Sequence, residues 1–315
     1  MKAEMPKGVI NIIFGDGPTT GAALVSSTNV DGVYYTGHAR AGGMIRDITS
    51  SDVHKKIHLE LSGRNSILVF ADSMEKANGT RQKTIEIAAR VAFENQGETF
   101  LGGFLILVER NIYELFVREF ANYVDKNYTV RKNVGPVVSE EAYKHACSFL
   151  RLAVDRGASF ELGAVPLPLE EKPRQDRGYL IPPVILTGGP DAADTNREVL
   201  SGPVVMIAPF DNEGQAVKMA SRGGQALISV VLTNDGLRQR RVGEQLPVQT
   251  VWANCLTQQE AVRQGSLLGE IRRRSSQGRV HVHQDSLLAG LLSRILEGKQ
   301  AASYVPVDWC KIRIV

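Results

Sequence analysis

Short apolar runs alternate along this chain with segments whose apolar residues recur at helical spacing. Residues 104–108 and 204–210 are continuous apolar runs, which are typical of strands buried on both faces of a sheet. Residues 112–124 and 141–156 have apolar side chains at the spacing of amphipathic helices, and the second of these segments stops at Gly157. Strands that alternate with helices predict an α/β fold in which helices are layered on a sheet.

The same patterns locate further elements. Residues 9–14 form a β-branched run that ends in a Gly/Pro turn, so we expect a strand there. Residues 257–285 are polar and carry no clear pattern, and residues 166–178 are expected to form a surface loop. The remaining predicted strands are residues 32–37, 58–61, 67–70, 228–233, 250–254 and 310–315, and the remaining predicted helices are residues 19–26, 40–50, 75–93, about 213–221 and 287–296.

Composition excludes several classes of protein. A chain of 315 residues can bury a large core, and we expect two domains. Its 37 basic and 34 acidic residues leave a net charge of +3, which gives no reason to expect nucleic acid or an anionic membrane as a partner. No apolar stretch reaches the ~18 residues of a membrane span, and the first residues lack the layout of a secretory signal.

The chain has three cysteines, Cys147, Cys255 and Cys310, which are far apart in the sequence. An odd, scattered set does not predict a disulfide framework, so we expect buried structural thiols in a reducing, cytoplasmic setting. His281 and His283 would share one face of a strand, and Asp285 is near. No further Cys, Asp or Glu with ligand spacing completes a site, so we expect no bound metal.

Two segments could belong to a binding or catalytic site, judged from their residues alone. Residues 15–21 (GDGPTTG) resemble a dinucleotide-binding loop, but the third glycine comes one residue late and Pro18 intervenes, which favours a strand–helix turn. Glu60 lies in an apolar strand beside a glycine turn. Burial would raise the pKa of this carboxyl toward that of a general base. An ion pair with Arg64 or a lysine explains the same residue equally well.

Four motifs, in one order within residues 6–255, resemble the aldehyde dehydrogenase superfamily, in particular its branch acting on muconic semialdehydes. A weaker match resumes over residues 302–315. Residues 35–38 (YTGH) resemble the family's Phe-Thr-Gly-Ser turn, residues 59–65 (LELSGRN) its Leu-Glu-Leu-Gly-Gly-Lys-Asn, residues 93–98 (FENQGE) the approach to its nucleophile, and residues 200–205 (LSGPVV) its Ile-Phe-Gly-Pro-Val segment.

The resemblance implies an aldehyde-dehydrogenase-like α/β fold in four parts. Residues 1–58 would be the remnant of a Rossmann-type nucleotide-binding domain, and residues 59–250 the catalytic-type α/β domain. Residues 251–303 would be a divergent return segment that lacks the family's Gly-Gly-x-Lys-x-Ser-Gly, and residues 304–315 an oligomerisation strand. Family members are longer at the N-terminus, where they carry a Lys for the adenosine ribose and an Asn for the oxyanion.

The resemblance also implies a reaction. In the family a cysteine thiolate attacks the aldehyde, hydride passes to NAD or NADP, and a glutamate activates the water that releases the acid. Glu60 matches that glutamate, while Thr36 and Gly37 match the turn beside the cofactor. His38 replaces the Ser of that turn. Phe100 stands where the family has its nucleophile, and a phenyl ring cannot form the covalent intermediate.

Further departures point the same way. Val199 replaces the glutamate that holds the nicotinamide ribose, and Thr99 has no dedicated base that would make it a nucleophile. We therefore expect a catalytically deficient aldehyde-dehydrogenase-like protein whose binding of NAD or NADP is weak or lost. It would survive as a homo-oligomer, or as a heteromer with a full-length relative through residues 309–315. The alternatives are an active aldehyde oxidoreductase and a gene remnant without a stable fold.

Overall fold

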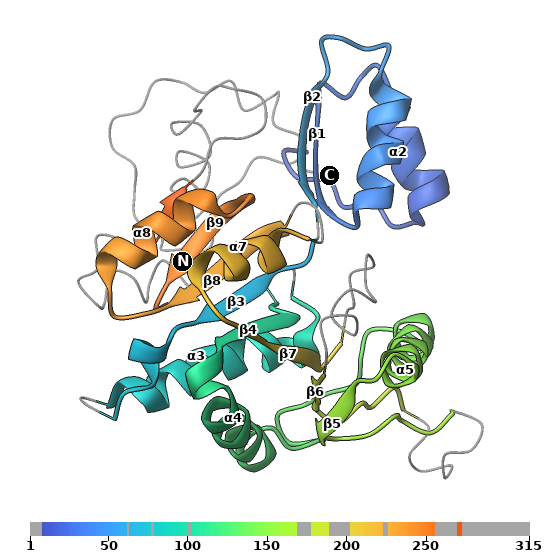
Figure 1. The fold of residues 1–315 in the computed structure, drawn as a ribbon. Coiled ribbons are helices and arrows are strands. Elements are labelled where there is room, and N and C mark those ends of the chain that lie inside the picture. The colour runs from blue at the N-terminus through green and yellow to red at the C-terminus, as the bar shows by residue number, and fades with distance from the viewer. Residues whose placement is uncertain are drawn as a thin grey trace, which may run out of the picture. The chain divides into compact units, whose positions relative to one another are not determined.

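The computed structural model describes residues 8–61, 63–76, 79–99, 102–168, 178–188, 202–222, 226–255 and 270–272. The chain divides into two compact units, which are described separately (Figure 1). The first comprises Met1–Leu61 and Arg274–Val315, and the second comprises Ser62–Arg273. The four-part division expected from the sequence stays a prediction.

The described part of the first unit is built on two parallel strands, β1 (Gly32–Gly37) and β2 (Lys56–Leu61). The helix α2 (Ala39–Thr49) connects them and lies beside them (Figure 1). Gly42 of α2 meets Leu61, because a Cβ on Gly42 would stand 2.4 Å from the Leu61 Cδ2 atom. A π-helical turn (Gly17–Gly21) and the short helix α1 (Ala22–Ser26) precede β1.

The strand predicted at residues 9–14 is wrong. Residues 11–16 have no regular structure, and no strand in the described part of the chain pairs with them. Ile12 and Phe14 are 78% and 89% exposed. β-branched side chains favour a strand because they pack well on a pleated, half-buried sheet surface. With no neighbouring strand among the described residues, that packing is not available to residues 9–14. The turn after them does lead into a helix, where Asp16 caps the first turn by accepting from the Thr19 amide.

The second unit contains an eight-stranded sheet with the order β10-β9-β8-β3-β4-β7-β6-β5. The six inner strands pair in parallel, and the edge strands β5 and β10 are antiparallel to their neighbours. The strands are β3 (Ser66–Val69), β4 (Leu105–Glu109), β5 (Ser159–Leu162), β6 (Val184–Thr187), β7 (Val204–Phe210), β8 (Ala226–Leu232), β9 (Val248–Ala253) and β10 (Glu270–Arg272).

Helices cover both faces of this sheet, so it has two cores. Ile67, Ile106 and Val230 pack on one face with α3 (Thr80–Phe93) and α4 (Tyr113–Asn127). On the other face, side chains that alternate with these, such as Leu68 and Leu107, pack against the three remaining helices (Figure 1). This burial on both sides explains the continuous apolar runs in the sequence. The three helices are α5 (Glu140–Asp155), α7 (Glu213–Ser221) and α8 (Gly236–Gln245).

Most elements expected from the sequence are confirmed, with helix α3 beginning later than predicted. Helix α8 was not predicted because its sequence, GLRQRRVGEQ, is dominated by polar residues, and its buried residues are only Gln239, Val242 and Gly243. Strand β10 lies in a segment that carries no clear pattern. The predicted elements at residues 287–296 and 310–315, and most of the loop at 166–178, lie outside the described residues. Within the part of the chain that is described, no helix has the length and apolarity of a bilayer span.

Candidate functional site

Three of the four sequence motifs meet at one end of the sheet in the second unit. Residues 63–65 lead into β3, residues 94–99 and 102–104 lead into β4, and Gly202 and Pro203 lead into β7. Because β3, β4 and β7 are parallel neighbours, these three loops lie together at the amino ends of the strands. Topology therefore brings together segments that are well over a hundred residues apart in the chain.

Asn65, the last residue of the motif at 59–65, ties these loops to the sheet. Its side-chain oxygen accepts hydrogen bonds from the Leu227 and Ile228 amides, at 3.1 and 3.0 Å. Its side-chain nitrogen donates to the Gly102 carbonyl at 2.9 Å. Asn65 is only 3% exposed, so its bonds are buried and strong. Sequence reasoning did not single it out, although a buried amide after a Gly-Arg pair could have signalled such a link.

The loop after α3 has an unusual backbone. Asn95, Gln96 and Gly97 adopt φ angles of 52°, 58° and 68°, so three consecutive residues lie in the left-handed region. This conformation costs a non-glycine residue roughly 1–2 kcal/mol, and it persists only where the surroundings enforce it. Gly97 cannot be replaced without rearrangement, since a Cβ there would lie 2.3 Å from the Gly202 carbonyl oxygen.

Neighbouring backbone enforces this conformation. The Gln96 side-chain oxygen accepts from the Gly135 amide at 3.2 Å, and the Glu98 carboxylate accepts from the Val138 amide at 2.9 Å. The Gly102 amide donates to the Thr99 carbonyl at 2.8 Å, which joins the described residues on the two sides of positions 100 and 101. Phe100 itself, like Val199, lies outside the described residues. The loop around the family's nucleophile position is thus tightly held on both sides of that position.

The other predicted residues lie in the first unit. Thr36 and Gly37 end β1, and Thr36 stands opposite Glu60 in the parallel register. His38 is the N-cap of α2, where its Nδ1 atom accepts a hydrogen bond from the Arg40 amide at 3.1 Å. The imidazole therefore performs the capping that a serine hydroxyl commonly performs, and it occupies one of the amides at the helix start.

Glu60 is not the desolvated carboxyl that was one of the two alternatives expected from the sequence, and the close partners of its carboxylate include Tyr34 and His58. The Tyr34 hydroxyl donates to its Oε1 atom at 2.6 Å, and the His58 Nε2 atom lies 3.6 Å from the same oxygen. The pKa of Glu60 is lowered, chiefly by His58 and, to a smaller degree, by Tyr34 and Thr36, while burial acts in the opposite direction. The predicted rise in pKa is wrong, because this face of the two strands carries polar partners and is half exposed.

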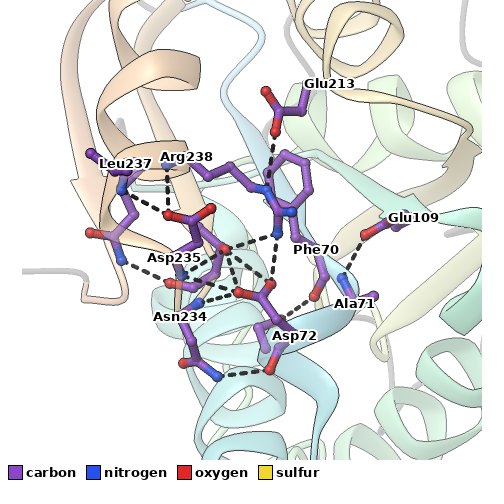
Figure 2. A network of polar contacts seen from close by, with 12 residues as sticks. Phe70, Ala71, Asp72, Glu109, Glu213, Asn234, Asp235, Leu237 and Arg238 are labelled. Atoms are coloured by element: carbon purple, nitrogen blue, oxygen red, sulfur yellow. Dashed lines mark hydrogen bonds and ion pairs between the residues drawn. The ribbon is translucent and has the colours of Figure 1, made fainter.

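The opposite end of the large sheet is occupied by a polar network (Figure 2). Open α/β sheets commonly bind ligands at the carboxyl ends of their strands. Here Asp72, after β3, accepts from the Thr233 hydroxyl at 2.7 Å and from the Asn234 amide at 2.8 Å, both after β8. Arg238 bridges Asp72 and Glu213 at 3.0 and 3.1 Å. The polar groups at the carboxyl ends of these strands bind one another. We therefore take the amino ends of β3, β4 and β7 as the candidate site.

Other candidate chemistry finds no support among the described residues. They contain no group of three side chains placed to hold a metal ion, and His281 and His283 lie outside them. Cys147 and Cys255 are buried, as expected of structural thiols, and no disulfide joins them. Cys310 lies outside the described residues.

Comparison with known proteins agrees with the motifs. The sequence profile of the aldehyde dehydrogenase family matches residues 1–285. A 2-aminomuconic semialdehyde dehydrogenase of Danio rerio is 31% identical over 259 residues, which cover 81% of this chain and 52% of the relative. Aldehyde dehydrogenase [NAD(P)+] 2 of Saccharomyces cerevisiae is 30% identical over 276 residues, covering 82% and 51%. The chain spans about half the length of these relatives.

Solved structures show the same likeness. An aldehyde dehydrogenase from Bartonella henselae superposes with a TM-score of 0.68 at 27% identity, covering 79% of this chain and 51% of that one. The betaine aldehyde dehydrogenase of Staphylococcus aureus, solved in complex with NAD+, has a TM-score of 0.68 at 26% identity, covering 80% and 49%. The family resemblance and the fold class expected from the sequence are therefore confirmed.

Proposed function

This chain belongs to the aldehyde dehydrogenase family, and we propose that it is a member unable to carry out the family's reaction. That reaction is the NAD(P)-dependent oxidation of an aldehyde to a carboxylic acid through a thiohemiacetal on a cysteine. The observation that carries the proposal is Phe100, which stands where the resemblance places that cysteine. A phenyl ring has no lone pair with which to attack a carbonyl carbon.

The geometry of the loop supports the assignment of position 100. The left-handed residues Asn95 to Gly97, the Thr99–Gly102 turn and the Asn65 link are specific, costly features that hold one turn in place. Such features are expected around a functional position, and at that position this sequence has Phe100. The proposal is that the surroundings of a nucleophile remain while the nucleophile itself is replaced.

Two further residues suggest that NAD or NADP binds weakly or not at all. Val199 stands where the family has a ribose-binding glutamate, and it can accept no hydrogen bond from a hydroxyl. At the start of α2, the imidazole of His38 stands where the family has the smaller serine, at a helix end that could face a phosphate. The residues of this chain thus fit a nicotinamide nucleotide poorly, and NAD and NADP are both to be tested.

The role left to such a chain is to pair with other chains. We propose that it forms a homo-oligomer, or a heteromer with a full-length aldehyde dehydrogenase, through residues 309–315, which resemble the family's oligomerisation strand. A strand can join a neighbour's sheet by backbone hydrogen bonds alone, so this role needs no catalytic residue. The compartment we propose is the cytoplasm, where thiols such as Cys147 and Cys255 stay reduced.

The catalytic proposal is tested with the purified full chain. NADH or NADPH formation is followed by absorbance over a panel of aldehydes that includes semialdehydes, and no turnover is expected. Phe100→Cys is also expected to stay inactive, because Val199 remains and the segment after Asn254 still lacks the family's Gly-Gly-x-Lys-x-Ser-Gly. Thr99→Cys is the matched control, with a thiol one position early. Turnover by the natural chain would establish the alternative, an active aldehyde oxidoreductase. Turnover by Phe100→Cys alone would show that only the nucleophile is missing.

The pairing proposal has its own test. The tagged chain is purified from its native cells and its mass in solution is measured by light scattering, with a truncation at residue 308 as the control. A self-associated species or a co-eluting dehydrogenase, lost on truncation, is expected. A monomer without such a companion contradicts the proposal.

A further inference from the structure

The exposed face of the β1–β2 pair carries a cluster of four polar or aromatic side chains. Residues alternate between the two faces of a strand, and the register places Tyr34 opposite His58 and Thr36 opposite Glu60. On the other face, Leu61 packs against Gly42 of α2. The four side chains therefore form one polar surface in the first unit, which we call the Glu60 cluster (Tyr34, Thr36, His58 and Glu60).

Both close contacts of Glu60 in this cluster converge on one carboxylate oxygen. Tyr34 Oη donates to Oε1 at 2.6 Å, and His58 Nε2 lies 3.6 Å from it. The phenol and imidazole rings stack on each other with centroids 4.4 Å apart and planes at 14°. The stack restricts the rotation of both rings, so the hydroxyl and the Nε2 atom are held where Oε1 lies. Hydrogen bonds from neutral donors to a carboxylate are short and strong only while the carboxylate is ionised.

We propose that Tyr34 and His58 are positioning residues that hold Glu60 as a fixed carboxylate, so that it supplies a permanent negative charge instead of accepting a proton. A neutral, protonated carboxyl is a weaker hydrogen-bond acceptor than a carboxylate, so a proton bound at either oxygen weakens the bond that Tyr34 donates to Oε1. The partners around Oε1 therefore favour the ionised form of Glu60.

The surrounding charges agree with this proposal. From β1, Tyr34 and Thr36 face Glu60, and from β2, His58 does; Lys56 lies two residues before His58 on the same strand face. Each of these is a hydrogen-bond donor or a cation, and helix α2 packs on the opposite face. The lowered pKa of Glu60 has the sign that such a set of partners produces.

The effect of the Glu60 cluster on catalysis rests on the proposed function, whereas its effect on the ionisation of Glu60 does not. Phe100 closes the step in which an aldehyde is attacked, and the Glu60 cluster would separately weaken the step in which water is activated. A cysteine restored at position 100 would therefore still have only a weakened proton acceptor. NADH formation decides the first statement, whereas the titration of a single carboxyl decides the second, so either can fail without the other.

The test is a titration of the Glu60 side-chain carboxyl carbon by NMR in the full chain, with Glu60→Gln identifying its signal. The inflection is expected below the ordinary value of about 4.3. Tyr34→Phe keeps the stacked ring and removes only the hydroxyl, so it should move the inflection upward. His58→Phe keeps an aromatic ring without a ring nitrogen and should also move it upward. Tyr35→Phe is the matched control, since its hydroxyl faces the His38 carbonyl at 3.5 Å, and it should leave the inflection unchanged.

Two results would overturn the proposal. One is a Glu60 inflection at or above the ordinary value in the natural chain. The other is an inflection that Tyr34→Phe and His58→Phe both leave in place. Circular dichroism at each pH defines the folded range. If the chain unfolds before the inflection, the comparison is made at the lowest pH with a native spectrum, where an ordinary carboxyl would already be partly protonated and Glu60 is expected to be fully ionised.

Discussion

The two units of this protein bury their apolar surface to different extents. In the second, helices cover both faces of an eight-stranded sheet, and side chains such as Leu107 and Phe120 are fully buried. In the described part of the first, residues 8–61, a two-stranded pair is packed beside short helices, and none of the apolar side chains there is less than 5% exposed. Eight of the thirteen exposed large apolar side chains in the described residues belong to residues 8–61. A two-stranded pair is marginal by itself, so the second unit is the stable body.

The units also differ in how they preserve the family's site. In the second unit, Asn65 and the left-handed residues 95–97 hold the loop before position 100, where the resemblance places the family's nucleophile and this sequence has Phe100. In the first, the matching glutamate, Glu60, accepts from Tyr34 and lies near His58. The proposed loss of function would therefore involve a replaced group in one unit and the partners of a retained group in the other.

The largest expected effect is on the core of the second unit. Phe120→Ala removes a fully buried ring packed against Phe93 and Phe116, which should cost roughly 3–5 kcal/mol of the free energy of unfolding. Phe14→Ala in the first unit, at a ring that is 89% exposed, should cost less than about 0.5 kcal/mol. Urea denaturation followed by fluorescence measures both. Similar costs for the two substitutions would contradict the comparison of the units.

Hydrogen exchange in the native state compares the units directly. Amides of β1 and β2 should be less protected than amides of β4 and β7 by on the order of a hundredfold, because the pair has little buried surface to hold it. Exchange measured by mass spectrometry on peptides from the two regions tests this. Equal protection would mean that the units unfold together.

A smaller effect is expected at the Asn65 link. Asn65→Ala leaves the Leu227 and Ile228 amides without their acceptor and should cost about 2–3 kcal/mol. The control is Asn127→Ala, since the Asn127 side chain donates to Tyr123 on the exposed surface and should matter little. Both are measured by urea denaturation. An Asn65 variant as stable as its control would show that the loops do not depend on this link.

The smallest effect is the pH dependence of the first unit. The pKa of Glu60 is lowered in the folded chain, so its stabilising contribution is complete above about 4.3 and is lost as the pH falls through the folded pKa. The protection of β1 and β2 amides should therefore decrease below that pH, by an amount within about 1 kcal/mol for a partly exposed group. Glu60→Gln should show less of this decrease. A variant with the same pH dependence would assign the effect to other groups.

The pattern of apolar residues in the sequence predicts most of the strands and helices of this fold. The apolar runs that became β4 and β7 are long because both faces of their sheet are buried, so their pattern is unambiguous. The pattern failed at residues 9–14, where side-chain preference had no neighbouring strand, and at α8, where few apolar residues mark the helix. The short strands β5 and β6 were also not predicted. Short-range preference is informative where burial is extensive, and it loses force at the margins of a core.

For the candidate site, too, some features follow from the sequence and others only from the tertiary structure. The sequence by itself determined the family, and it predicts that Phe100 stands where the family has its cysteine, because both depend on residue identity at a position. Only the tertiary structure decided that Asn65 ties the loops to β8, and that Tyr34 and His58 converge on one oxygen of Glu60. The proton affinity of a carboxyl depends on the atoms within a few ångströms of it. Tyr34 lies 26 residues from Glu60 in the chain, and the parallel pairing of two strands brings them together.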